Sequence, residues 1–339
     1  TKRFKHILLI EKEASFGHHI SSRNSEVIHS GIYYEPNSLK AELCVRGNQL
    51  MYDFANKNNI EYNNCGKFII ASNNNEMNQL ELLLQNGLKN DVQSMRMVSK
   101  NEVYTKEPLI KSYGALYIPS SGIINSHELM KKIEYNIKCK NVDIVYNLEV
   151  TNIEKNNTNY ILSFKKYNYQ AESNIVINAT GLWCDKISSL VGINKYKIHY
   201  CKGEYYKTSK YRNQINTLIY PLPTDISLGI HIVLHLDGSI AFGPNAYYVD
   251  KIDYNITQQN KNYFLEHINK YISINPNELN EDFAGIRPKL QSAGNNTCDF
   301  IINNETNSGY NNFINLIGID SPGLTSSLAI AEHIPKIIQ

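Results

Sequence analysis

The feature that most constrains the fold is an alternation of short apolar runs with amphipathic stretches, which breaks off in the middle of the chain. Apolar runs of about five residues bounded by turn residues are typical of buried strands, and stretches with apolar residues at helical spacing predict helices. The predicted strands are His6–Ile10, Lys67–Ala71, Val142–Tyr146 and Ile175–Ala179. The predicted helices are Leu39–Asn58, Met77–Gly87, Ser126–Cys139, with Ser126 as its cap, and Leu324–Ile338.

The middle of the chain has a different pattern, in which predicted strands follow one another with only short turns between them. Consecutive strands of this kind favour an antiparallel sheet. They are Tyr200–Lys207, Thr217–Pro221, His231–His235 and Ser239–Gly243. The fold class is therefore α/β, or α+β overall, with a parallel sheet in one part and an antiparallel sheet in another. No repeat of fixed period is visible, which excludes solenoids and propellers.

Composition narrows the class of protein. The chain has 339 residues, of which 42% are hydrophobic and 19% charged, enough for about two domains of about 150 residues. Lys and Arg total 34 against 32 Asp and Glu, and this balance argues against a nucleic-acid partner. No apolar run approaches the ~20 residues of a transmembrane segment. The six cysteines form no CxxC pair, so a reducing compartment is expected and a zinc site is not.

Glu11 ends the first predicted strand. In a dinucleotide-binding βαβ unit, an acidic residue at the end of the second strand accepts hydrogen bonds from the ribose. Glu11 and Lys12 could equally open a solvated loop. No GxGxxG turn precedes Glu11. We therefore expect residues 1–339 to be part of a longer protein or an incomplete gene model that lacks about 30 residues at the front, the length of a βαβ start.

Four further segments have residue types suited to ligand binding. Gly17–Tyr34 combines hydroxyl side chains with an arginine, and Ile175–Gly181 is a strand that runs into a turn of small residues. In Gly285–Pro288, the backbone between glycine and proline fixes an arginine suited to a carboxylate. Asn315–Thr325 leads from a strand into a helix whose N-terminus can meet an anion. An ordinary polar loop, a plain turn and a surface arginine are the alternative readings.

Eight motifs, in their order along the chain, resemble one family. They are SSRNSEVIHSGIYY, SLKAELCVRG, KGEYY, IYPLP, LGIH, GPNA, GIRP and GIDSPGLTSSLAIAE. Together they resemble the FAD-dependent L-2-hydroxyglutarate dehydrogenases and oxidases, within the superfamily of D-amino-acid oxidase and glycerol-3-phosphate dehydrogenase. The likeness runs from Ile7 to about Ile334. It departs from the family at the front, because the GxGxxG segment is missing.

The resemblance implies two domains built from separate segments of the chain. Residues 1–65, 119–195 and 281–339 would form an N-terminally incomplete, Rossmann-like FAD-binding domain. Residues 66–118 and 196–280 would form a substrate-binding domain with an antiparallel sheet. Without the GxGxxG segment, this chain alone is expected to bind FAD poorly and to aggregate.

The resemblance also implies contacts with FAD at the positions that match the family's motifs. Glu11 would bind the adenosine ribose, and Val150 would contact the adenine through its backbone. Along the cofactor would lie Ser21, Ser22 and Arg23. Beside the ADP would lie Ala179, Thr180 and Gly181. The flavin ring would be contacted by Gly318, Ile319, Gly323 and Leu324.

The implied reaction is oxidation of L-2-hydroxyglutarate to 2-oxoglutarate by hydride transfer to flavin N5. A dianionic substrate requires fixed cations, and Arg287 is predicted to bind the C1 carboxylate and Lys202 the distal one. His231 is the first candidate for the base and His29 the second, and each could instead be a structural histidine. Tyr220 is expected to line the substrate pocket, as are Tyr205 and Tyr206, although most tyrosines serve packing.

Two alternatives remain open: a related flavin dehydrogenase that acts on glycerol 3-phosphate or another small acid, and a truncated, non-catalytic member of the family. The expected partners are a small dicarboxylate substrate and an electron acceptor, which would be a quinone, oxygen or an electron-transfer protein. The expected location is the cytoplasm or the periphery of the inner membrane, and the mitochondrion in a eukaryote.

Overall fold

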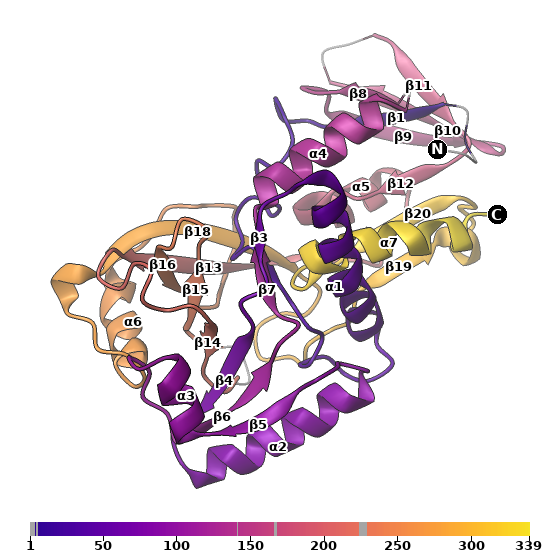
Figure 1. Cartoon of the computed structure of the whole chain (residues 1–339). Coiled ribbons are helices and arrows are strands. Elements are labelled where there is room, and N and C mark those ends of the chain that lie inside the picture. The colour runs from indigo at the N-terminus through magenta and orange to yellow at the C-terminus, as the bar shows by residue number, and fades with distance from the viewer. Residues whose placement is uncertain (1–3, 5, 141, 166–167, 224–228) are drawn as a thin grey trace.

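Two groups of sheets lie on either side of a pair of long, packed helices in the computed structural model (Figure 1). The structure describes residue 4 and residues 6–140, 142–165, 168–223 and 229–339. One group is a nine-stranded sheet with a short three-stranded sheet beside it, and the other consists of smaller sheets near the N-terminal strand. The predicted mixture of parallel and antiparallel sheets is confirmed.

The nine-stranded sheet collects the consecutive strands from the middle of the chain. All of its pairs are antiparallel except β4–β14. In spatial order its main path is β17 (Tyr247–Val249), β13 (His199–Thr208), β16 (Ile240–Gly243), β15 (His231–Leu234), β14 (Leu218–Tyr220), β4 (Lys67–Ala71), β6 (Gly114–Ile118) and β5 (Arg96–Ser99), and β18 (Asn280–Lys289) pairs with β13.

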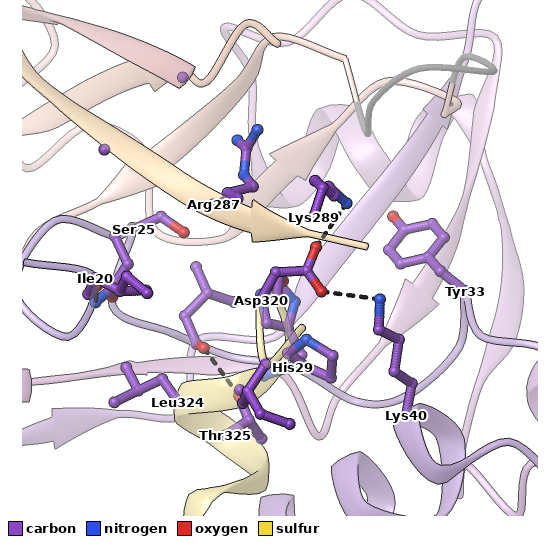
Figure 2. Close-up of a pocket in the computed structure, with 18 of the residues that line it drawn as sticks. Ile20, Ser25, His29, Tyr33, Lys40, Arg287, Lys289, Asp320, Leu324 and Thr325 are labelled. Atoms are coloured by element: carbon purple, nitrogen blue, oxygen red, sulfur yellow. Dashed lines mark hydrogen bonds and ion pairs between the residues drawn. The ribbon is translucent and has the colours of Figure 1, made fainter. Parts of the chain in front are cut away.

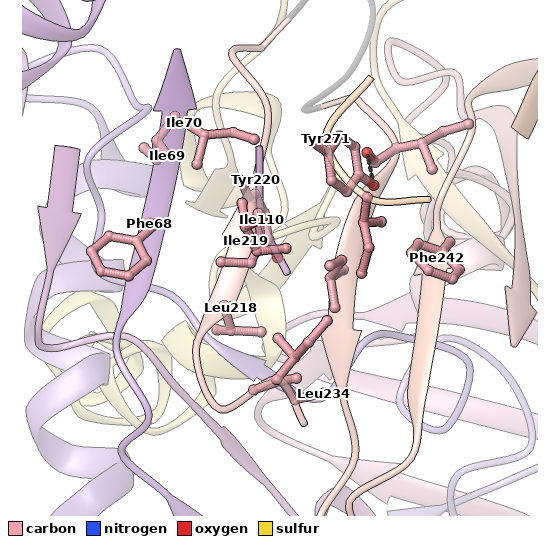
Figure 3. Packing of buried hydrophobic residues seen from close by; sticks show 14 of the residues in the cluster. Phe68, Ile69, Ile70, Ile110, Leu218, Ile219, Tyr220, Leu234, Phe242 and Tyr271 are labelled. Atoms are coloured by element: carbon pink, nitrogen blue, oxygen red, sulfur yellow. Dashed lines mark hydrogen bonds between the residues drawn. The ribbon is translucent and has the colours of Figure 1, made fainter. Parts of the chain in front are cut away.

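The largest apolar core of the described residues packs on this sheet (Figure 3). Phe68, Leu218 and Phe242 come from three of its strands and are at most 3% exposed. Helices α2 (Asn74–Lys89), α3 (Lys100–Lys106) and α6 (Lys261–Ile268) contact the strands. Because strands and helices contribute apolar side chains to one cluster, the sheet is held rigidly.

The smaller sheets gather strands from residues 7–178 and 301–317. Two of them contain parallel pairs, namely β1 with β8 and β12 with β20. Their members are β1 (Ile7–Ile10) and β8 (Val142–Val145); β12 (Val176–Asn178), β20 (Phe313–Ile317) and β19 (Ile301–Asn304); β9 (Val150–Asn156), β10 (Asn159–Phe164) and β11 (Gln170–Ser173); and β2 (Val27–Ile28), β7 (Gly122–Ile124) and β3 (Tyr62–Asn63).

Helices α1 (Leu39–Asn58) and α7 (Gly323–Ile337) join the two groups through a close crossing. A Cβ atom on Gly47 would lie 2.3 Å from the backbone oxygen of Thr325, so only glycine permits this contact. The remaining helical segments are α4 (Ser126–Lys138), α5 (Cys184–Leu190), η1 (Gly181–Trp183), η2 (Gln258–Asn260), η3 (Pro276–Glu278) and η4 (Glu305–Ser308).

The start of α4 departs from the prediction by one residue. The cap is Asn125, whose side-chain oxygen accepts a hydrogen bond from Glu128 N at 2.9 Å. The hydroxyl of Ser126 instead donates to Glu26 Oε1 at 2.6 Å. Asn and Ser are comparable caps, and the tertiary contact with Glu26 decides between them.

The structure describes all six cysteines, and each is a free thiol. Within the described ranges, no group of three or more His, Cys, Asp or Glu side chains is arranged to hold a metal ion. The helices found there are also too short or too polar to span a membrane.

Candidate active site

A cavity of about 950 Å³ lies where α7 begins, between β18, β13, β15 and the loop around residues 20–29. Figure 2 shows side chains from distant segments pointing into the same space, among them His29, Arg287 and Asp320. The elements that meet here belong to both groups of sheets. The cavity is therefore built at their junction, which is a common location for a ligand site.

Gly285 on β18 holds the loop around residues 20–29 against the strand. A Cβ atom at Gly285 would lie 2.2 Å from the backbone oxygen of Arg23, so a side chain there would push the loop away. The loop is also held by Arg23 Nη1, which donates to Ala284 O at 3.3 Å. The Arg23 guanidinium lies 4.1 Å from the ring centroid of Tyr254.

His231 presents an unused ring nitrogen at the cavity wall. Its Nδ1 lies 3.0 Å from Gly229 O, and because a carbonyl only accepts hydrogen bonds, Nδ1 carries the proton. Nε2 is therefore unprotonated; it is buried and has no hydrogen-bond partner among the described residues. Burial lowers the pKa of His231 to about 3, which keeps the imidazole neutral. The ring stacks on Tyr220 with centroids 3.7 Å apart and an interplanar angle of 18°.

His29 is the second imidazole in the cavity. Its Nε2 lies 3.5 Å from Ser321 Oγ, and its buried Nδ1 has no hydrogen-bond partner in the described part of the chain. Burial, followed by the charge of Lys67 and then His231, holds the pKa of His29 well below its usual value. Thr325 Oγ1 fixes the backbone here, because it accepts from His29 N at 3.0 Å and donates to Val27 O at 3.2 Å.

Arg287 lies on β18 opposite Cys201 of β13. Its guanidinium lines the cavity, and Nη1 lies 3.8 Å from Cys201 Sγ. A Cβ atom on Gly203 would lie 2.8 Å from Arg287 Nη2, so this glycine makes room for the guanidinium. Tyr205 stacks on Phe283 at 4.3 Å, and burial raises the pKa of Tyr205, which keeps its phenol neutral.

Two lysines and one aspartate form a buried ion triad at the cavity wall. Lys40 Nζ lies 2.9 Å from Asp320 Oδ1, and Lys289 Nζ lies 2.6 Å from Asp320 Oδ2. Burial raises and the two ammonium groups lower the pKa of Asp320, and the net result is a pKa below its usual value. Figure 2 shows the lysines reaching the carboxylate from α1 and β18.

The N-terminus of α7 also faces the cavity through Gly323, Leu324 and Thr325. The first N–H groups of a helix have no intrahelical partner and carry a partial positive charge. This end of the helix can therefore stabilise negative charge on a bound group.

Most of the residues expected from the sequence line this cavity, and some do not. Those that line it are Ser21, Arg23, His29, Ala179, Gly181, Tyr205, Tyr220, His231, Arg287, Ile319, Gly323 and Leu324. Those outside its lining are Glu11, Ser22, Val150, Thr180, Lys202, Tyr206 and Gly318. Glu11 and Val150 lie near each other beyond the β1–β8 pair, since Leu148 N donates to Glu11 O at 3.0 Å.

The position of Lys202 does not support the role expected of it. Alternate residues of a strand point to opposite faces, and Gly203 and Tyr205 of β13 face the cavity. Lys202 lies on the other face, where its ammonium donates to Asn255 O and lies 3.9 Å from Glu204 Oε1. The sequence showed the alternation but not which face would meet the cavity.

Several cavity residues had no individual role expected from the sequence, among them Ser25, Lys40, Lys289 and Asp320. One signal could have found Lys289, which lies two residues after Arg287 and hence on the same face of a strand. The triad has no sequence signal, because its members are far apart along the chain.

Comparison with known proteins gives the class. The family model described as FAD dependent oxidoreductase matches residues 1–336. The chain therefore belongs to the family of FAD-dependent oxidoreductases, and its cofactor is FAD.

Three curated relatives narrow the comparison. A protein of Arabidopsis thaliana named "L-2-hydroxyglutarate dehydrogenase, mitochondrial" is 34% identical over 98% of this chain and 78% of its own length. The L-2-hydroxyglutarate dehydrogenase of Escherichia coli strain K12 is 32% identical over 71% of this chain and 57% of its own. A protein of Caloramator mitchellensis named "Glycerol 3-phosphate dehydrogenase" is 30% identical over 98% of this chain and 68% of its own length.

Solved structures share the fold. The L-alpha-glycerophosphate oxidase of Mycoplasma pneumoniae, solved with FAD bound, has a TM-score of 0.87 and 26% identity, and the match covers 98% of this chain and 88% of that one. Glycine oxidase of Geobacillus kaustophilus has a TM-score of 0.82 and 16% identity, and the match covers 99% of this chain and 88% of that one.

The residues around the cavity fit a flavin cofactor. Gly181 has a positive φ of 56°, and a Cβ atom there would lie 2.9 Å from Ile20 Cδ1, so a larger residue would narrow the cavity. Ala179 adds a second small side chain beside it. Gly323 N at the start of α7 already donates to Asp320 O, and the partial positive charge of this helix end faces the cavity, where it can stabilise the negative charge of a reduced ring.

Proposed function

We propose that the protein oxidises L-2-hydroxyglutarate to 2-oxoglutarate. The observation that carries the proposal is that Arg287 and the unpartnered nitrogens of two neutral histidines line one cavity. Oxidation of a 2-hydroxy acid requires a cation for the carboxylate and a base for the hydroxyl proton. The names of relatives from Arabidopsis thaliana and Escherichia coli support the choice of substrate. Bound FAD would accept the hydride from C2.

In this proposal His231 takes the hydroxyl proton. Its Nε2 is free and unprotonated, and its Nδ1–H is held by Gly229 O at 3.0 Å. Tyr220 would orient the ring by stacking at 3.7 Å and would line the substrate position. His29 is the second candidate, because its Nδ1 is also free. A neutral imidazole is the form that accepts a proton, so burial of both rings supports either assignment.

Arg287 would bind the C1 carboxylate. Its guanidinium is held on β18 between Gly285 and Pro288 and can offer two parallel N–H groups to a carboxylate. Lysine at this position would keep the charge but lose the paired geometry.

For FAD, we propose that the contacts follow the family pattern. Ser21, Ser22 and Arg23 would lie along the cofactor, with Glu11 and Val150 at its adenosine end. The turn after β12 would flank the ADP through Ala179, Thr180 and Gly181. The segment that leads into α7 would contact the flavin ring through Gly318, Ile319, Gly323 and Leu324.

The division into an FAD-binding part (1–65, 119–195, 281–339) and a substrate-binding part (66–118, 196–280) is also a proposal. The nine-stranded sheet supports it, because all its strands except β18 come from residues 66–118 and 196–280. β18 covers Asn280–Lys289 and crosses from one part to the other.

A second candidate substrate is glycerol 3-phosphate. The Caloramator mitchellensis and Mycoplasma pneumoniae proteins, whose names refer to this compound, favour it. The carboxylate-binding geometry of Arg287 favours the 2-hydroxy acid.

The experiment that decides is anaerobic reduction of the FAD-loaded protein by a panel of substrates. L-2-hydroxyglutarate should bleach the flavin absorbance, and D-2-hydroxyglutarate and glycerol 3-phosphate should not. Equal bleaching by glycerol 3-phosphate would contradict the proposal. An oxidoreductase also needs an electron acceptor, and reoxidation by oxygen, a quinone and an electron-transfer protein can be compared in the same samples.

A further inference from the structure

We propose that Lys289, supported by Lys40 and Asp320, binds the second carboxylate of a dicarboxylate substrate. This inference rests on the proposed function and deepens it, because it assigns the residues that distinguish a dicarboxylate from a monocarboxylate. It replaces the role that the sequence suggested for Lys202.

The charge of the triad provides the first argument. Two ammonium groups lie within 2.9 Å of a single carboxylate, so the group carries one uncompensated positive charge. The side chain of Lys40 is 6% exposed and that of Asp320 is 2% exposed, so water screens this charge poorly. A buried charge without a counter-charge is costly, and an anion in the cavity would remove that cost.

Other acidic groups do not neutralise the surplus. Glu35 and Asp299 are the other acidic residues in the cavity lining, and no ion pair of Glu35 with Lys40 or Lys289 occurs among the described residues. Asp299 has partners elsewhere. Its two oxygens accept hydrogen bonds from Leu39 N at 2.7 Å and Lys40 N at 2.9 Å, which assigns it to the N-terminus of α1. Within the described residues, Asp299 forms no ion pair with Lys40 or Lys289.

The spacing along β18 provides the second argument. Arg287 and Lys289 both line the cavity and are two residues apart on one face of the strand. Two residues of a strand span about 6.6 Å. The terminal carbons of an extended five-carbon chain lie about 5 Å apart, with bonds of about 1.5 Å. One five-carbon dicarboxylate can therefore reach both cations.

The two lysines have different parts in this site. The side chain of Lys289 is 18% exposed against 6% for Lys40, so Lys289 is the more accessible to a ligand. Asp320 holds the Lys289 ammonium at 2.6 Å and thereby fixes its position. Lys40 then acts through Asp320, as a positioning residue that supplies the surplus charge.

The test measures binding of unreactive ligands to the FAD-loaded protein by calorimetry, with glutarate as the dicarboxylate and butyrate as the monocarboxylate. In Lys289→Met, we expect glutarate to bind about 10- to 100-fold more weakly, the cost of a charged hydrogen bond. Butyrate should change by less than about threefold. The ratio of kcat/KM for L-2-hydroxyglutarate over L-2-hydroxybutyrate should fall in parallel.

Lys40→Met is the second variant, in case Lys289→Met does not fold. It leaves Lys289 paired with Asp320 as a neutral pair, so glutarate should again lose affinity while butyrate does not. Lys207→Met is the matched control, because Lys207 pairs with Asp282 at 2.9 Å with a side chain that is 56% exposed, and it does not line the cavity. It should leave both affinities unchanged.

The outcomes separate this inference from the function on which it rests. If wild-type protein oxidises L-2-hydroxyglutarate but both lysine variants weaken glutarate and butyrate equally, the second carboxylate site is wrong and the function stands. If wild-type protein oxidises neither 2-hydroxy acid, the function is wrong, and selective loss of glutarate binding still supports an anion site at Lys289.

Discussion

Two buried polar clusters in this molecule are organised in opposite ways. Beside β20, the carboxylate of Glu305 is 0% exposed and accepts four hydrogen bonds of at most 3.0 Å. The donors are Lys195, Tyr196, Ser308 and Asn315. At the cavity, Tyr220 OH, His231 Nε2 and His29 Nδ1 are buried without a hydrogen-bond partner among the described residues. The same holds for Lys67 Nζ, which lies behind the cavity wall, 4.2 Å from the ring centroid of Tyr220.

The contrast indicates what each cluster does. Buried polar groups that stabilise a fold are paired, because an unpaired one costs about 1–3 kcal/mol. A binding site keeps such groups free for its ligand, at the expense of stability. Changes at the Glu305 cluster should therefore affect folding and not chemistry, and changes at the cavity should do the reverse.

The largest expected effect is on the reaction, at His231. His231→Gln keeps a polar side chain but removes the proton acceptor, and loss of a general base costs about 10²- to 10⁴-fold in the chemical step. Stopped-flow measurement of anaerobic flavin reduction checks this. As a control, the melting temperature of the variant should stay within a few degrees of wild type.

His29→Gln is the matched variant for the same measurement. We expect it to alter flavin content or spectrum more than the rate of reduction. A slow His29 variant beside a normal His231 variant would exchange their assignments.

The second effect is on stability, at Glu305. Its partners lower its pKa to about 2 although burial opposes this, so the carboxylate stabilises the fold above its unfolded pKa, and this contribution is lost as pH falls from about 4.5 to 2. Glu305→Gln should destabilise by about 3 kcal/mol at neutral pH, the free energy that corresponds to lowering the carboxyl pKa from 4.5 to about 2, because the amide lacks the charge that the partners stabilise. Urea denaturation at pH 7 and pH 4 measures the difference.

The activity of the folded fraction is the control for Glu305. If Glu305→Gln reduces flavin turnover per bound FAD without lowering stability, the division between a structural and a functional cluster fails.

The sequence predicted elements better than it predicted faces. Helix α1 has the expected bounds, because its apolar spacing is regular and Ser38 Oγ caps it by accepting from Ala41 N at 3.1 Å. The face of β13 that meets the cavity depends on which sheet packs against it, so Lys202 could not be separated from its neighbours. The Lys40–Asp320–Lys289 triad depends on long-range folding, which local patterns do not record.

The edges of the smaller sheets show the same limit. The sequence predicted strands at His6–Ile10 and Ile175–Ala179, and the structure has β1 at Ile7–Ile10 and β12 at Val176–Asn178, paired in parallel with β8 and β20. Leu8, Leu9 and Ile177 are 43%, 40% and 45% exposed, although strands of parallel sheets are usually covered on both faces. In the described residues, the β1–β8 pair and the β12–β20–β19 sheet are not hydrogen-bonded to each other.

The smallest expected effect concerns Lys67. It tests whether the unpaired polar groups at and beside the cavity lower the stability of the folded protein. Lys67 lies on β4, is 0% exposed, and its ammonium lies 4.2 Å from the ring centroid of Tyr220. Burial lowers its pKa to about 8 from an ordinary value of 10.5. The folded protein therefore carries an energetic penalty of about 3 kcal/mol below pH 8.

Between pH 8 and 10.5 the unfolded chain binds more protons at Lys67 than the folded protein does, so wild-type stability should rise with pH across this interval. Lys67→Met fills a similar volume without the charge. It should stabilise the protein by about 2–3 kcal/mol below pH 8, and this advantage should disappear by about pH 10.5. Denaturant melts of both proteins at pH 7 and pH 10 measure the difference, in which the titration of other groups cancels. If Lys67→Met is no more stable than wild type at pH 7, the charge of Lys67 is stabilised in the folded protein, as that of Glu305 is. The unpaired groups at and beside the cavity would then not lower the stability of the fold.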